Sequence, residues 1–259
     1  MRLWLAVSLA ALLAPAAPAA FADDWDTDLP EKDEFRQTYT LQPGAQVRLA
    51  DISGVADIET TAGPTAEVHI VRSARSRQDL EHGKIDVIHT PSSLEVRSAS
   101  ERGNWNTGRH DVRQRITIRV PRDVNLSIVD ISGRVRAGAV GGTLDVADIS
   151  GMVSVQEAGG YCSVTDISGK VEVAVFRLGE RGLVVRDISG MVTVGLPGEV
   201  GAELSVTDVS GRVNADLPNM NVHTKRDRNE FDATLGGGGP RIEVADVSGM
   251  VKLRGGAGR

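Results

Sequence analysis

The chain has 259 residues, a net charge of −6 and an aromatic content of only 3%. The acidic balance argues against a nucleic-acid partner, which would need a basic face. Because aromatic residues are so few, the core must be built from Val, Ile, Leu and Ala, and with 29 glycines this composition indicates an all-β protein rich in turns.

The N-terminus has the features of a secretory signal peptide. Arg2 supplies a positive charge, an apolar run follows, and the small residues Ala20 and Ala22 occupy the two positions that a signal peptidase reads. We expect residues 1–22 to be removed by cleavage after Ala22. A retained membrane anchor is the weaker interpretation, because two prolines interrupt the run. No later stretch reaches the roughly 18 apolar residues that span a bilayer. The mature chain, with a net charge of −7 after the loss of Arg2, is therefore expected to be periplasmic or secreted.

The elements that follow can be predicted in chain order. Residues 23–40 begin with the acidic segment DDWDTDLPEKDE, which has no hydrophobic periodicity, and we expect them to form a flexible, solvated segment. Alternation of apolar and polar residues then predicts strands over 45–54, 66–74, 84–90, 93–100 and 111–121. Between these strands, 75–83 is expected to form one helical turn and 101–110 a polar loop.

A four-residue motif, D-(I/V)-S-G, recurs along the chain and most densely after Pro121. Its seven copies begin at Asp51, Asp130, Asp148, Asp166, Asp187, Asp208 and Asp246. The successive spacings are 79, 18, 18, 21, 21 and 38 residues. A period of about 20 residues with one short β unit per repeat is typical of solenoids. The sequence therefore predicts a β-solenoid, similar to a parallel β-helix, over residues 41–259.

The spacing of apolar residues around the motif indicates a corner. With the aspartate at position 0, positions −4, −2, +1, +5 and +7 are apolar or small in every copy. The inward face therefore changes from even to odd positions at the aspartate, whereas a continuous strand keeps one parity. We expect one strand to end at the aspartate and a second to follow it. A β-hairpin with Ser-Gly as its turn is the alternative, but it would place seven aspartates on the valine face.

The motif itself is not expected to be catalytic. An enzyme needs one nucleophile held against one base, and a serine in seven equivalent copies is not such a residue. We predict no catalytic, cofactor-binding or metal-ligating residues, and we interpret the seven aspartates as structural corners that accept backbone hydrogen bonds in Asx-type turns. Calcium bound along the stacked carboxylates is the alternative, although the denser G-G-x-G-x-D pattern of calcium-binding β-rolls is absent.

Three further features bear on function. Position +4 should point outward, and in five consecutive repeats it alternates between basic residues and methionines. We interpret this row as a solvated face, with a partner-binding stripe as the alternative. Cys162, the only cysteine, occupies a core position and is expected to be a buried apolar filler. A specific ligand site would be sought first in the non-repeating loop 102–110.

Two segments resemble the bacterial DUF4097 family, which carries the label "putative adhesin". They are ITIRVPRDVNLSIVDISGRVRAG, which leads into the repeats, and LGGGGPRIEVADVSGMVKL near the C-terminus. The resemblance covers most of the chain from about residue 41 onward. It implies a β-solenoid of the cell envelope and brings no catalytic residues with it.

The expected function is that of an exported, non-enzymatic scaffold or adhesion module, whose partner is an envelope protein or a surface glycan. Two alternatives stay open at this point. One is a polysaccharide-acting β-helix enzyme, and the other is a periplasmic accessory protein of an envelope signalling system. A fold alone does not separate these functions.

Overall fold

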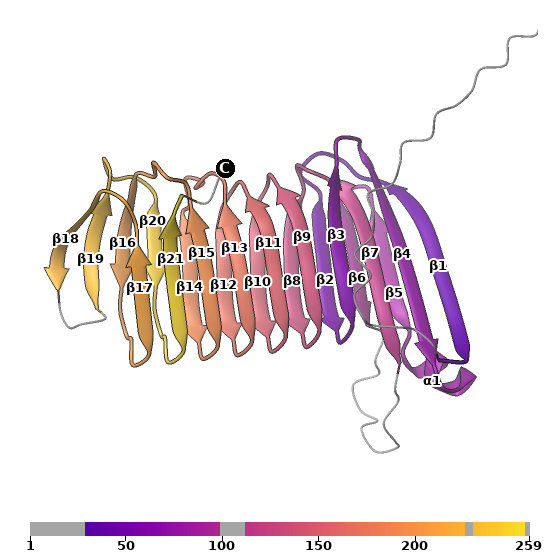
Figure 1. Cartoon of the computed structure of the whole chain (residues 1–259). Helices are drawn as coiled ribbons and strands as arrows, with labels where there is room; N and C mark the ends of the chain where they lie inside the picture. Colours follow the sequence, from indigo (N-terminus) through magenta and orange to yellow (C-terminus); the bar gives the residue numbers. More distant parts are fainter. Residues whose placement is uncertain (1–28, 99–111, 226–229, 257–259) are drawn as a thin grey trace, which may run out of the picture.

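The computed structural model describes residues 29–98, 112–225 and 230–256, which form two β-sheets that face each other (Figure 1). Sheet A consists of β1 (Glu31–Thr40), β3 (Val55–Thr61), β4 (Thr65–Ala74), β7 (Arg113–Pro121), β9 (Arg134–Val140), β11 (Met152–Ala158), β13 (Lys170–Val175), β15 (Met191–Leu196), β17 (Arg212–Asp216) and β21 (Met250–Gly255). Sheet B consists of β2 (Gln46–Ile52), β5 (Ile85–Thr90), β6 (Ser93–Ser98), β8 (Asn125–Ile131), β10 (Leu144–Ile149), β12 (Cys162–Ile167), β14 (Leu183–Ile188), β16 (Ala202–Val206), β18 (Met220–Lys225), β19 (Phe231–Leu235) and β20 (Arg241–Val244). The prediction of an all-β chain is confirmed.

The predicted helical turn is present as α1 (Arg77–His82). Its N-cap is Ser76, whose side chain accepts a hydrogen bond from the backbone N–H of Asp79, as capping serines commonly do. The strands predicted from alternation correspond to β2, β4, β5, β6 and β7. In the described part of the chain, no helix is both long and apolar enough to cross a membrane.

The central strands of both sheets run parallel, and successive repeats stack in register. In sheet B, Val146 of β10 lies beside Val164 of β12, and in sheet A, Val153 of β11 lies beside Val171 of β13. Each D-(I/V)-S-G motif leads from a strand of sheet B into a strand of sheet A. The motif therefore lies at a corner between the two sheets, and the strands on either side of it do not pair with each other as a hairpin.

The order of repeats in the stack differs from their order in the chain. In sheet B, β2 lies between β6 and β8, and in both sheets the last repeat is inserted, with β20 between β14 and β16 and β21 between β15 and β17 (Figure 1). Although 79 and 38 residues separate some of the motifs along the chain, all seven motifs lie on adjacent strands of the stack. Along the stack, the corners follow one another in the order Asp51, Asp130, Asp148, Asp166, Asp187, Asp246 and Asp208.

The core lies between the two sheets and is filled by the predicted positions. Of the residues at −4, −2, +1, +5 and +7, only Val209, Val213 and Ala215 are partly exposed, and all the others are buried. These three belong to the Asp208 repeat, whose strand β17 ends sheet A. They are less covered because this repeat has no further strand of sheet A beside it.

The structure differs from the flexible segment expected over residues 23–40 at residues 31–40. Residues 31–40 form β1, which pairs antiparallel with β4 along its whole length. Most residues of β1 are exposed on both faces of the strand. Because neither face is buried, the sequence of β1 does not alternate between apolar and polar residues. Residues 23–28, like the leader 1–22, lie outside the described residues.

Candidate interaction surface

Backbone conformation explains why an aspartate begins every motif. All seven aspartates have a left-handed backbone, with φ between 52° and 55°, a region that Asp and Asn tolerate better than most residues. The pairing of β10 with β12 skips this residue, since Ala147 pairs with Thr165 and Ile149 with Ile167. The left-handed residue thus turns position +1 toward the core after position −2, which is the change of parity seen in the sequence.

The glycine of each motif lies where two backbones approach closely. A Cβ on Gly151 would lie 2.0 Å from the carbonyl oxygen of Gly133, and a Cβ on Gly169 would lie 2.0 Å from that of Gly151. The inserted last repeat follows the same rule, because a Cβ on Gly249 would lie 2.1 Å from the carbonyl oxygen of Gly190. Only glycine fits such an approach, so the motif sets how closely the repeats stack.

The hydrogen bonds of the corner differ from the expected Asx-type turn. The N–H groups of Ser150 and Gly151 both donate to the carbonyl oxygen of Ile131 in the neighbouring repeat, at 3.0 Å. The corner donors therefore bond between repeats. The carboxylate of Asp148 is not among the acceptors of the hydrogen bonds in the described residues.

The seven carboxylates form an exposed row along one edge of the molecule. Partial burial raises the pKa of Asp148 above its ordinary value, and the neighbouring carboxylates of Asp130 and Asp166 raise it further. This is the repulsion expected of like charges on adjacent strands. Within residues 29–98, 112–225 and 230–256, no group of three or more His, Cys, Asp or Glu side chains is arranged to hold a metal ion.

The row at position +4 is only partly as expected. Met152 is exposed on sheet A, but Val55 is buried, contrary to the prediction that this position points outward. In the stack, Met250 pairs with Met191 on one side and with Arg212 on the other. Because the last repeat is inserted, the alternation of basic residues and methionines along the sequence is not kept in space.

Cys162 lies in the core, as predicted. It is fully buried between Leu144 and Leu183 of the neighbouring strands. Burial is the main cause that raises the pKa of the Cys162 thiol to about 12, with a smaller contribution from Asp145. A thiol with such a pKa is almost entirely protonated at neutral pH and is a poor nucleophile.

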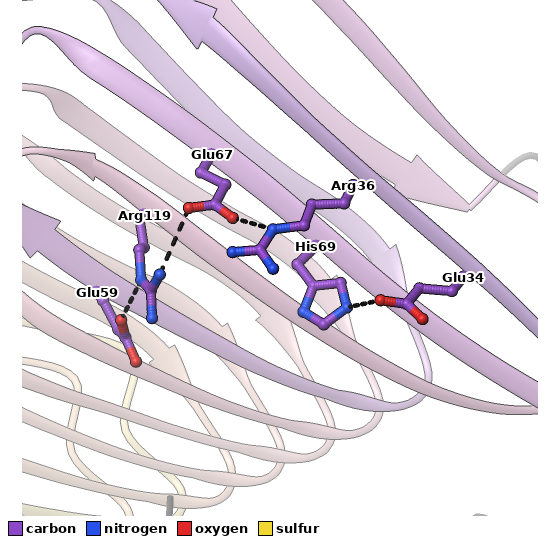
Figure 2. A network of polar contacts seen from close by, with 6 residues as sticks. All are labelled: Glu34, Arg36, Glu59, Glu67, His69 and Arg119. Carbon is purple, nitrogen blue, oxygen red and sulfur yellow. Dashed lines mark hydrogen bonds and ion pairs between the residues drawn. The ribbon is translucent and has the colours of Figure 1, made fainter. Parts of the chain in front are cut away.

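A charged network crosses the outer face of sheet A at its β1 end, and it was not predicted from the sequence (Figure 2). Its members come from β1, β4, β7 and β3 and are Glu34, His69, Arg36, Glu67, Arg119 and Glu59. His69 Nε2 lies 2.9 Å from Glu34 Oε1. Arg119 forms two ion pairs, one from Nε to Glu59 Oε2 at 2.8 Å and one from Nη1 to Glu67 Oε2 at 3.4 Å. The available signal was a glutamate two positions before an arginine at 34–36 and a glutamate two positions before a histidine at 67–69.

Electrostatics within this network follow from its pairing. The hydrogen bond from Arg36 is the largest influence on Glu67 and lowers the pKa of its carboxyl. The hydrogen bond to Glu59 is the largest influence on Arg119 and raises its pKa. Because the side chains are all partly accessible to solvent, each pair contributes little to stability. Together they connect the antiparallel strands β1, β4 and β7 to the first parallel repeat.

A hollow of about 400 Å³ lies at the edge opposite the seven aspartates, where the strands of sheet A turn back to sheet B. Two of its residues, Gly141 and Gly159, have no side chain and leave the space open. The side chains that give the hollow its chemical character are those of Arg122, Glu157, Phe176 and Arg177. Arg122 and Glu157 form an ion pair with an Nη2–Oε2 distance of 2.9 Å.

This hollow was not predicted from the sequence, because its residues come from strand ends and turns that are separated along the chain. The predicted location of a ligand site, the loop 102–110, lies outside the described residues. Phe176 is the most exposed of the large apolar side chains in the described part, with 59% of its surface accessible. Its backbone N–H donates to the carbonyl oxygen of Ala158 at 2.8 Å, which fixes the start of the turn.

Comparisons with known proteins show structural similarity at low sequence identity. No protein-family model and no curated protein matches the chain, so membership of the DUF4097 family stays an expectation. A Clostridium sporogenes structure described as a "putative cell adhesion protein" is 12% identical with a TM-score of 0.47, over 86% of this chain and 100% of that one. A Bacteroides fragilis "putative adhesin" is 14% identical with a TM-score of 0.44, over 87% and 99%. A Parabacteroides distasonis "putative lipid binding protein" is 11% identical with a TM-score of 0.26, over 85% and 96%.

Proposed function

We propose that the mature chain is an exported, non-enzymatic β-solenoid that acts as an adhesion or interaction scaffold in the cell envelope. The observation that carries this proposal is the uninterrupted row of seven D-(I/V)-S-G corners. In each corner the aspartate sets the left-handed backbone, the Ile or Val joins the core side of the strand, and the glycine permits close stacking. The repeated motif thus has structural tasks that account for its repetition.

The architecture suits binding over an extended surface. Parallel strands in register repeat equivalent side chains at a spacing of about 4.8 Å. Stacked repeats of this kind form rigid, elongated surfaces on which turns and non-repeating loops carry the specificity. The edge with the seven carboxylates and the edge with the hollow offer two such surfaces of different chemistry.

The proposed location rests on the leader. We propose cleavage after Ala22, release into the periplasm or the medium, and a partner that is an envelope protein or a surface glycan. N-terminal sequencing of the protein from fractionated cells tests this part. The expected first residue is Asp23, and a cytoplasmic chain that still begins with Met1 would contradict it.

The interaction role is tested with purified residues 23–259 immobilised and exposed to envelope extracts, with and without EDTA. A specific partner should be retained under both conditions, identified by mass spectrometry, and then bound again as a purified component. The chain length of envelope glycans should be unchanged after incubation with the protein. Depolymerisation of a glycan would contradict the non-enzymatic proposal and would support a polysaccharide-acting enzyme.

A further inference from the structure

The hollow beside Phe176 combines three kinds of side chain that together fit a particular ligand chemistry. The first is the aromatic ring of Phe176, of which 59% of the residue surface is exposed. An exposed aromatic face is stabilised when a ligand covers it with an apolar surface of similar size. Phe176 is one of the residues that line a hollow with room for a small ligand group, about 400 Å³.

The second component is the positive charge of Arg177. Its Nε lies 3.4 Å from the carbonyl oxygen of Gly159, a long contact that holds only one side of the guanidinium. No carboxylate in the described residues pairs with this group. Its two terminal nitrogens can therefore donate to a ligand carboxylate in the paired geometry that guanidinium groups favour.

The third component is the exposed ion pair of Arg122 and Glu157. Their side chains are 59% and 46% accessible, so both keep unused hydrogen-bonding capacity on the side that faces solvent. The guanidinium can donate to hydroxyl oxygens, and the carboxylate can accept hydrogen bonds from hydroxyl groups. A ligand with several hydroxyl groups would satisfy both.

The glycines between these groups keep the hollow open. A Cβ on Gly159 would lie 3.1 Å from the carbonyl oxygen of Gly141, so a larger residue would meet backbone as well as fill the space. The hollow lies on an edge of the molecule and is open to solvent, so a ligand need not be enclosed on all sides to occupy it. A unit within a polymer therefore fits the site as well as a single small molecule.

We propose that this hollow binds an acidic sugar, a hexuronate unit of an envelope polysaccharide. The apolar C–H face of the sugar ring stacks on Phe176, its carboxylate accepts hydrogen bonds from Arg177, and its hydroxyl groups bond to Arg122 and Glu157. A neutral sugar leaves the charge of Arg177 unpaired, and an acidic peptide lacks a rigid ring with hydroxyl groups. This inference rests on the proposed interaction function and names its ligand class.

The test is a calorimetric titration of residues 23–259 with oligogalacturonate, and with the same oligosaccharide after reduction of its carboxyl groups to alcohols. Saturable binding to the acidic form is expected, with affinity at least about tenfold weaker for the reduced form, because the Arg177 ion pair is lost. Phe176→Ala and Arg177→Gln should each weaken binding of the acidic form about tenfold.

Two matched variants serve as controls. Phe35→Ala removes the other exposed phenylalanine, on β1, and Arg212→Gln removes an exposed arginine, on β17. Both should bind oligogalacturonate as the unaltered protein does, and the thermal midpoints of all four variants should confirm that they fold.

The proposal is overturned if oligogalacturonate does not bind, or if reduction or both hollow variants leave its affinity unchanged. It is also overturned if polyglutamate binds equally well with the same dependence on Phe176 and Arg177, which would assign the hollow to an acidic peptide. Failure here is distinguishable from failure of the scaffold role, since an envelope protein would still be captured by the Arg177→Gln variant.

Discussion

The carbonyl oxygen of Gly133 lies 2.0 Å from the point that a Cβ of Gly151 would occupy. This relationship recurs between neighbouring motifs of the stack, including the pair Gly190 and Gly249, whose repeats are not consecutive in the chain. The close backbone approach is therefore a property of the stack and not of local sequence. It explains why the fourth residue of the motif is glycine in every copy.

Replacement of a motif glycine should be strongly destabilising. Gly151→Ala is expected to lower the free energy of unfolding by about 3 kcal/mol, because the new methyl group meets a backbone oxygen that cannot move without shifting a strand. Gly63→Ala is the control, since the nearest atom to its Cβ is 3.9 Å away, and it should change stability by less than about 0.5 kcal/mol. Urea unfolding followed by circular dichroism measures both. Equal effects of the two substitutions would contradict the stacking role of the glycine.

The aspartate should be replaceable by asparagine but not by alanine. Asp148 has φ of 54°, a conformation that costs alanine about 1–2 kcal/mol and asparagine less. Asp148→Asn also removes a charge that its neighbours repel. We expect Asp148→Asn to be at least as stable as the unaltered protein and Asp148→Ala to be less stable than Asp148→Asn by about 1–2 kcal/mol. An alanine variant as stable as the asparagine variant would show that backbone conformation does not select this residue.

Stability should also depend on pH through this carboxyl group. The pKa of Asp148 is raised in the folded chain above its ordinary value of 3.8, so the folded state binds the proton more tightly than the unfolded state. The contribution of Asp148 to the free energy of unfolding should therefore fall as the pH rises above 3.8, and become constant above the raised pKa.

The difference in unfolding free energy between the unaltered protein and Asp148→Asn isolates this contribution from other groups. Glu67 acts in the opposite direction, because its pKa is lowered by Arg36, and it cancels in the difference. The unfolding free energy of the unaltered protein minus that of Asp148→Asn should fall as the pH rises from 3.8 to the raised pKa. If this quantity instead rose with pH, repulsion between the corner carboxylates would be contradicted.

Cys162 should be inert in the folded protein. Because the thiol is buried and its pKa is raised to about 12, iodoacetamide should label it only after unfolding in urea. Cys162→Val should change stability by less than about 1.5 kcal/mol, as similar apolar replacements do, whereas Cys162→Ser should cost about 1–3 kcal/mol by burying a hydroxyl group. Rapid labelling of the native protein would show that the thiol is accessible.

Much of the fold could be predicted because the same pattern of apolar positions recurs in seven copies that can be aligned. Positions such as Val146 and Ile149 are apolar in every copy, and their change of parity marks the corner within the sequence itself. The burial of Cys162 followed from the same alignment. The hydrogen bonds of the corner were not predictable in this way, since the backbone N–H of Ser150 bonds to another repeat.

Other features depend on relationships that spacing along the chain does not encode. The insertion of β20 and β21 follows from contacts between residues such as Val192 and Val251, which lie far apart in sequence. Strand β1 is exposed on both faces and therefore lacks hydrophobic alternation. The hollow brings Arg122 and Phe176 together from separate turns, and no motif linked them.

Unfolding with and without calcium distinguishes a structural role of the aspartate row from a metal site. The free energy of unfolding of residues 23–259 is determined by urea titration in EDTA and in excess calcium, with Asp148→Asn measured in parallel. We predict the same unfolding free energy in EDTA and in calcium, and no loss of stability in Asp148→Asn. A large stabilisation by calcium that Asp148→Asn abolishes would show that the row of aspartates is a metal site.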